Sequence, residues 1–142
     1  MSEQNYKNHT RILPIWHFVG GVAIFVVFVA SIVHFIKSYP DNILGPLILL
    51  LISIILIVIY WYARRFALLA QDRAIRAEEN LRHYILTGKA LDRRLHMGQI
   101  VALRFAQDEE FPTLAEKALK ENLTNRQIKT AIKVWKPDHN RV

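Results

Sequence analysis

The sequence has no cysteine, and only five glycines and five prolines among its 142 residues. The lack of cysteine excludes disulfides, thiolate nucleophiles and cysteine-ligated metal sites. Phosphate loops, nucleotide-binding glycine motifs, HExxH metal sites and nucleophile elbows are missing from the sequence as well. These absences predict a protein that is not an enzyme and that carries no cofactor.

Charge is missing from two long stretches, residues 14–36 and 43–63, which contain no Asp, Glu, Lys or Arg. A helix that crosses a bilayer needs about 20 mostly apolar residues, and each stretch meets that requirement. Only KSYPDN separates the two runs, so a pair of core helices in a soluble protein is disfavoured. The first run also exceeds the apolar part of a cleaved signal peptide, which is about 7 to 15 residues long. We predict an all-α membrane protein with a two-helix transmembrane hairpin over residues 14–63.

The charged residues around the two runs predict the orientation of the hairpin. The net charge is +7, and Lys7 and Arg11 precede the first run while Arg64 and Arg65 follow the second. The positive-inside rule therefore places both termini in the cytoplasm and the turn at residues 39–42 outside. Aromatic residues near the cytoplasmic ends of both runs suit the interface with lipid headgroups.

A heptad pattern of small and apolar residues continues from the second run past the two arginines. Its members alternate in steps of four and three: Leu49, Ser53, Leu56, Tyr60, Ala63, Ala67, Ala70, Ala74, Ala77, Leu81 and Tyr84. Asp72 with Arg76 and Glu78 with Arg82 have the i,i+4 spacing of a solvated helix, and Gly88 is a typical helix stop. One helix is therefore expected over residues 44–87, with its second half forming a cytoplasmic stalk.

The alanine positions of this stalk have two explanations. Alanine has the highest helix propensity, so the alanines can belong to a solvated helix without a partner. Small residues also let a second helix approach closely, and an unbroken heptad register is typical of helix–helix contact. We favour the contact, with a second copy of the chain or with another membrane-protein subunit.

The first run has its own stripe of small and polar residues at three- and four-residue spacing. The stripe contains His17, Gly20, Ile24, Val27, Ser31 and His34, with Gly21 beside it. Such a stripe is typical of helix–helix contact in lipid, and packing on the second run would use it. Haem ligation is an alternative because imidazole is a common axial ligand. His17 and His34 are about 25 Å apart along one helix, so a shared iron would need a histidine from another chain.

Three short helices are expected beyond Gly88, over residues 97–107, 111–121 and 125–135. Asp108 is a candidate cap for the second helix, Thr124 and Gln127 have capping-box spacing for the third, and Asn122 can end the helix before it. About 45 residues rarely make a stable core alone. This three-helix cluster should therefore dock on the stalk, the membrane surface or another subunit.

Basic residues are frequent in the cytoplasmic part of the chain. The candidates for contact with anionic lipid or an acidic partner are Arg64, Arg65, Arg93, Arg94, Arg126, Lys129 and Lys133. Attraction to lipid headgroups accounts for this excess. Contact with a ribosome or with nucleic acid is an alternative, although three consecutive acidic residues, 108–110, disfavour a uniform basic surface.

Several segments carry a resemblance to a known family. They are NYKNHTR (5–11), LTGKALDRRL (86–95), QIVALRFAQDEEFP (99–112) and NRQIKTAIKVWKPDHNRV (125–142). With the hairpin, they resemble a family of small uncharacterised two-span proteins of the bacterial inner membrane, found largely among Bacteroidota. The resemblance implies a multi-pass inner-membrane protein, and it brings no activity, ligand or functional residue with it.

These observations divide the chain into four parts. Residues 1–13 form a cytoplasmic N-terminal segment, 14–63 the hairpin, 64–88 the stalk and 89–142 a basic helical region. The function that we expect is that of an accessory, anchoring or assembly subunit of a membrane complex. A haem-binding electron-transfer subunit and a membrane anchor for a ribosome or nucleic acid are the alternatives.

Overall fold

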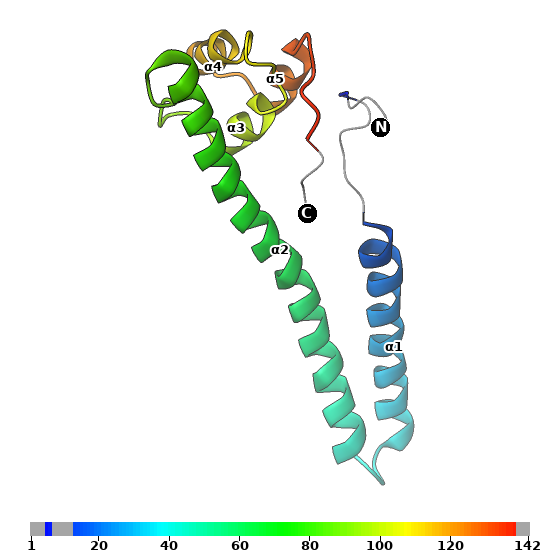
Figure 1. The fold of residues 1–142 in the computed structure, drawn as a ribbon. Coiled ribbons are helices and arrows are strands. Elements are labelled where there is room, and N and C mark those ends of the chain that lie inside the picture. Colours follow the sequence, from blue (N-terminus) through cyan, green and yellow to red (C-terminus); the bar gives the residue numbers. More distant parts are fainter. Residues whose placement is uncertain (1–4, 7–12, 139–142) are drawn as a thin grey trace. The chain divides into compact units, whose positions relative to one another are not determined.

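A computed structural model describes residues 5–6 and 13–138 of the chain. Over these residues the protein is all-helical, with five α-helices and no strand, as predicted (Figure 1). The helices belong to two compact units, one that contains residues 13–67 and one that contains residues 68–138. Candidates among residues 1–4, 7–12 and 139–142, including Lys7 and Arg11, lie outside the described residues.

The first unit contains two neighbouring helices. A π-helical segment, Ile15–Gly20, leads directly into helix α1, Gly21–Ser38. After a turn at residues 39–43, helix α2 begins at Leu44 and lies beside α1 within this unit (Figure 1). Both helices are long and apolar enough to cross a membrane.

Helix α2, Leu44–Thr87, has the bounds that the sequence predicts. Pro46 lies in its first turn, where the missing N–H is not needed. Between Pro46 and Gly88 the sequence has no residue that interrupts a helix. Gly88 ends the helix with a φ of 72°, and its N–H donates to the Tyr84 carbonyl at 2.8 Å. The positive φ explains why glycine occupies this position.

The second unit has a compact apolar core. It contains α3, Met97–Leu103, α4, Phe111–Lys120, and α5, Asn125–Ala131, which lie together near the end of α2 that precedes Gly88 (Figure 1). Phe105, Phe111, Leu103 and Ile128 are almost completely buried in this core, and α2 contributes Ile75. The three-helix cluster therefore packs on the stalk, which is one of the three docking surfaces expected from the sequence.

The local signals at α5 are confirmed. The Thr124 hydroxyl accepts a hydrogen bond from Gln127 N–H, and the Gln127 side chain accepts one from Thr124 N–H. This reciprocal pair is the capping box that the sequence predicts. Asn122 has a φ of 47°, as expected for a residue that follows the end of a helix.

The predicted ends of α3 and α5 are wrong by four residues each. α3 ends at Leu103 instead of residue 107, and α5 ends at Ala131 instead of residue 135. The segments that follow the two helices pair with each other in an antiparallel bridge between Ala106 and Trp135. Lys136 N–H also donates to the Phe105 carbonyl at 2.8 Å. Backbone pairing between distant segments thus replaces the last turn of both helices.

The start of α4 also differs from the prediction. Glu110 occupies the capping position in place of Asp108, and its side chain makes no cap hydrogen bond. The Glu110 carboxylate instead accepts hydrogen bonds from the backbone N–H groups of Lys133 and Val134, at 3.2 and 3.3 Å. Asp108 forms an ion pair with Arg82 of α2. Both acidic residues connect distant segments and leave the helix end uncapped by a side chain.

Candidate functional site

The contact between α1 and α2 is made by polar and small residues. The hydroxyls of Ser31 and Ser53 lie 3.1 Å apart, and both side chains are buried. Each hydroxyl is also 2.7 Å from a carbonyl one turn earlier in its own helix, Phe28 for Ser31 and Leu50 for Ser53. Small hydroxyl residues of this kind permit close packing of helices in lipid and satisfy their own polar atoms.

A second contact lies at the other end of this helix pair. The rings of Trp16 and Tyr60 stack with centroids 4.4 Å apart and planes 8° apart. The Tyr60 hydroxyl donates to the Trp16 carbonyl at 2.6 Å, and the same carbonyl accepts from Gly21 N–H across the π-helical segment. A Cβ on Gly20 would lie 3.2 Å from the Tyr60 ring, so glycine makes room for this stack.

The structure brings some residues of the predicted α1 stripe into this contact and leaves others outside. Gly20, Gly21 and Ser31 face α2, as their contacts with Tyr60 and Ser53 show. His17 and His34 are exposed, and the Nδ1 atom of His17 lies 2.9 Å from the carbonyl of Leu13, which precedes the helix. The two histidines thus lie apart from the α1–α2 contact. Among the residues that the structure describes, no group of three His, Asp or Glu side chains is placed to hold a metal ion.

The surface of this unit is apolar while its interior contact is polar. Only 6% of the most apolar window of Ile15–Ser38 and 11% of that of Leu44–Thr87 are buried. The exposed side chains include Phe18, Val22, Phe25, Ile36, Ile48, Ile55 and Ile59. A soluble protein rarely exposes so continuous an apolar surface, which marks contact with lipid or with another protein.

The alanine stripe of α2 lies beside the face on which the three-helix cluster packs. The cluster covers Ile75, whereas Ala70, Ala74 and Ala77 are exposed. Ala63 is exposed as well, and Ala67 is half-buried. The alanine stripe thus stays largely accessible, and its contact with a second helix stays a prediction.

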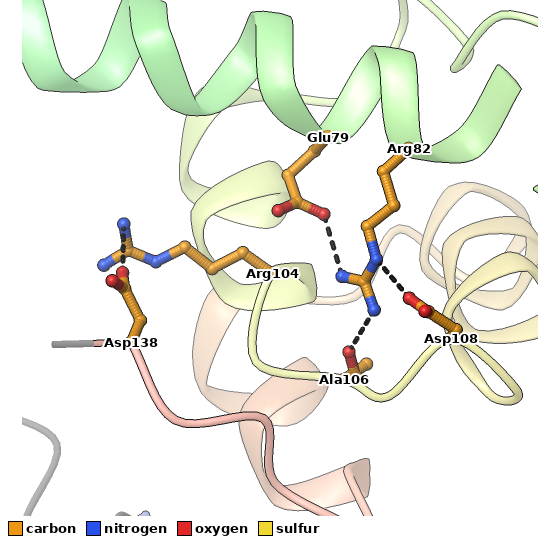
Figure 2. Close-up of polar contacts among 6 residues, drawn as sticks. All are labelled: Glu79, Arg82, Arg104, Ala106, Asp108 and Asp138. Carbon is orange, nitrogen blue, oxygen red and sulfur yellow. Dashed lines mark hydrogen bonds and ion pairs between the residues drawn. The ribbon is translucent and has the colours of Figure 1, made fainter. Parts of the chain in front are cut away.

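An ionic network with a largely buried Arg82 joins α2 to the segment between α3 and α4 (Figure 2). The Arg82 guanidinium contacts the Glu79 carboxylate at 3.0 Å, the Asp108 carboxylate at 2.6 Å and the Ala106 carbonyl at 2.6 Å. It also lies 4.4 Å from the centroid of the Phe111 ring. The expected pairing of Arg82 with Glu78 is wrong, because Glu79 faces the same side as Arg82 and Glu78 is exposed.

Burial raises the pKa of the Glu79 carboxyl above its ordinary value, and the hydrogen bond from Arg82 opposes this shift only in part. A second buried arginine of the same unit, Arg104, pairs with Asp138 at 2.9 Å (Figure 2). Sequence analysis missed both networks because Asp108 and Asp138 are far in the chain from the arginines with which they pair.

The predicted basic residues of the second unit differ in their exposure. Arg93, Arg94, Arg126 and Lys133 are exposed, whereas Lys129 is half-buried with its amino group 5.6 Å from the Phe105 ring centroid. The Asp92 carboxylate forms an ion pair with Arg94, and the hydrogen bond from Arg94 lowers the pKa of Asp92 to about 2. In the first unit, Arg64 is half-buried and Arg65 is exposed.

The described residues therefore contain packing surfaces and structural ion pairs. Comparison with known proteins agrees with the resemblance in one respect, that the matching family has no known function. A family of unknown function, DUF6526, matches residues 1–142. The chain belongs to the DUF6526 family. No curated protein matches the chain, and no solved structure matches it.

Proposed function

We propose that this DUF6526 protein is a non-enzymatic integral membrane protein that serves as an accessory, anchoring or assembly subunit of a membrane complex. In this proposal, residues 14–63 form a two-span hairpin and residues 64–88 continue the second helix as a stalk. Residues 89–142 then form a basic helical cap. The membrane is the bacterial inner membrane, and both termini lie in the cytoplasm.

The observation that carries the proposal is the inverted distribution of polarity in residues 13–67. The buried residues of this unit include Ser31, Ser53 and Pro46, while its large apolar side chains are exposed. The core helix of a soluble protein can be equally long and apolar, but it is mostly buried. Lipid is the solvent in which an apolar exterior and a small, polar helix contact are both favourable.

The orientation rests on charge and on the interfacial aromatic residues. Arg64 and Arg65 follow the apolar part of α2, and Trp16 and Tyr60 stack at the corresponding end of α1. Cationic side chains favour the cytoplasmic side, and tryptophan and tyrosine favour the interface. The short turn at residues 39–42 then lies on the opposite side.

The alanine stripe supports a partner helix. Ala70, Ala74 and Ala77 remain exposed although the three-helix cluster packs on the neighbouring face of α2. Small side chains allow the axis of another helix to come close. The partner is a second copy of the chain or another membrane subunit, and lipid headgroups contact Arg93, Arg94, Arg126, Lys129 and Lys133 of the cap.

Membrane insertion and orientation can be tested with single cysteines, because the natural sequence has none. Asn42→Cys and Arg126→Cys would be exposed to a membrane-impermeant maleimide in intact cells and in opened cells. We expect the first to react in both and the second only after opening. Release of the protein by alkaline carbonate, or equal reaction of both cysteines in intact cells, would contradict the proposal.

The partner contact can be tested by replacing Ala67, Ala70 and Ala74 with glutamine and measuring co-purification in mild detergent. We expect the assembly to dissociate, because each longer side chain separates the two helices. Leu69→Gln is the matched control, since Leu69 is exposed on a different face of α2. A chain that is monomeric in every detergent and lipid, or an assembly indifferent to the triple substitution, would rule out the stripe as an interface.

A further inference from the structure

A cavity of about 450 Å³ lies in the second unit, between α2 and the segment that follows Gly88. Its wall contains Arg73, Arg76 and Asn80 of α2, Leu91 and Arg93 of the following segment, and Ile100 of α3. Leu91 and Ile100 are buried, so the floor is apolar, while the three arginines are exposed. The volume is in the range of pockets that hold small organic ligands, roughly 300 to 1,000 Å³.

The positive charge of this wall is not neutralised by the acidic residue beside it. Asp92 also lines the cavity, but Arg94 engages both of its oxygens, with Nε at 3.1 Å and Nη2 at 2.9 Å. Among the residues that the structure describes, neither Arg73 nor Arg93 forms an ion pair. Arg76 makes one long hydrogen bond, from Nη2 to the Leu95 carbonyl at 3.5 Å.

The wall is held in place by hydrogen bonds within the unit. Leu91 N–H donates to the Asn80 side-chain oxygen at 2.9 Å, which leaves the amide NH₂ group of Asn80 to act as a donor. The His83 ring lies 2.8 Å from the Lys89 carbonyl, and Arg94 N–H donates to Asp92 at 2.9 Å. The segment that carries Arg93 is therefore fixed against the helix that carries Arg73 and Arg76.

We propose that this cavity binds an anion that carries a phosphate group attached to a small organic group. Guanidinium groups form bidentate hydrogen bonds with phosphate oxygens, and three arginines line the cavity. The apolar floor of Leu91 and Ile100 suits the organic part. The phosphate can belong to a soluble phosphomonoester or to a lipid headgroup, and the proposal does not require the chain to span a membrane.

The test uses the full chain in uncharged detergent and phosphate-free buffer. Phenyl phosphate binding would be measured by isothermal titration calorimetry, and retention of phosphatidylglycerol over phosphatidylcholine by native mass spectrometry. The key variant is Arg73→Gln with Arg93→Gln. The matched control is Lys117→Gln with Lys120→Gln, which removes the same charge from exposed positions outside the cavity. Circular dichroism would show that both variants keep the helical fold.

We expect saturable binding of at least one probe, weakened by about tenfold or more in the Arg73 and Arg93 variant and unchanged in the control. Binding of phenyl phosphate would identify a soluble phosphomonoester as the source. Binding of phosphatidylglycerol alone would identify a lipid headgroup. Absence of saturable binding for both probes, or equal weakening in both variants, would overturn the proposal.

Discussion

The two units of this chain distribute polarity in opposite ways. In residues 13–67 the buried contact includes serine hydroxyls and the exposed surface is valine, isoleucine, leucine and phenylalanine. In residues 68–138 phenylalanine, leucine and isoleucine are buried, and most charged side chains are exposed. Burial of large apolar side chains builds the core of the second unit, whereas the contact between α1 and α2 in the first unit uses small and polar side chains. The contrast indicates that each unit is suited to a different solvent.

The largest expected loss of stability is confined to the second unit. Phe111 is completely buried and carries the Arg82 guanidinium on its face. Phe111→Ala should lower the free energy of unfolding of residues 68–138 by about 3 to 5 kcal/mol. Hydrogen exchange measured along the chain would show faster exchange there and unchanged exchange in α1. Phe66→Ala is the control, since the Phe66 side chain is 61% exposed. An equal increase of the hydrogen-exchange rate in both units would contradict the division of the chain into two units.

The second largest expected loss of stability is in the first unit, at the contact between α1 and α2. In Gly20→Val the new Cβ would lie 3.2 Å from the Tyr60 ring, so the Trp16–Tyr60 stack must shift. Overpacking of this kind typically costs about 1 to 3 kcal/mol. Gly45→Val is the matched control, because its nearest neighbour would be 4.0 Å away. Disulfide trapping between cysteines introduced at residues 31 and 53 would report the helix contact. Identical trapping in both valine variants would show that Gly20 has no packing role.

A smaller effect concerns the pH dependence of the second unit. Burial raises the pKa of Glu79 in the folded state above 4.5, so the folded state binds the proton more tightly than the unfolded state does. The contribution of this group to stability is therefore present below pH 4.5 and is lost as the pH rises through the folded-state pKa. Asp92, with a pKa of about 2, stays ionised over that range.

Glu79→Gln tests this pH dependence. We expect the stability of the variant relative to the natural chain to rise between pH 4 and pH 7, as measured by denaturant unfolding at each pH. Glu78→Gln, at an exposed position, should show no such trend. A difference that is constant with pH, or that changes in the opposite direction, would show that the Glu79 carboxyl does not have a raised pKa.

The smallest expected effect is on the hydroxyl pair of the first unit. Ser53→Ala removes the contact with Ser31, and hydrogen bonds between membrane helices contribute about 0.6 kcal/mol on average. A double-mutant cycle with Ser31→Ala, read by unfolding in mixed micelles, would isolate this contribution. A coupling of several kcal/mol would mean that the hydroxyls, and not close packing, hold the two helices together.

Local sequence signals predicted much of the fold. The uncharged runs, the heptad pattern and Gly88 define α2, and the capping box defines the start of α5, because each depends on neighbouring residues. The ends of α3 and α5 were missed because pairing between Ala106 and Trp135 determines them. No local pattern contains the information that two segments about 30 residues apart will meet.

Sequence periodicity could not predict which face of α2 joins the core of the second unit, for a related reason, and contact of the alanine stripe with a partner helix stays a prediction. Periodicity assigns a stripe, but neighbouring positions on a helix fit almost the same period. On α2 the cluster packs against Ile75 while the alanines remain exposed, because a large apolar side chain gains more from burial than alanine does. The ionic network of Arg82 also fixes this rotation of the helix, and two of its partners come from residues 106 and 108.

The inverted polarity of residues 13–67 has a consequence for the order of events during synthesis. This part of the chain leaves the ribosome before residues 68–138, so its apolar exterior meets water while the charged part is still being made. An exterior of that kind aggregates unless a hydrophobic environment receives it at once. In the membrane placement that we propose, delivery of the nascent chain therefore begins before residues 68–138 have been completed.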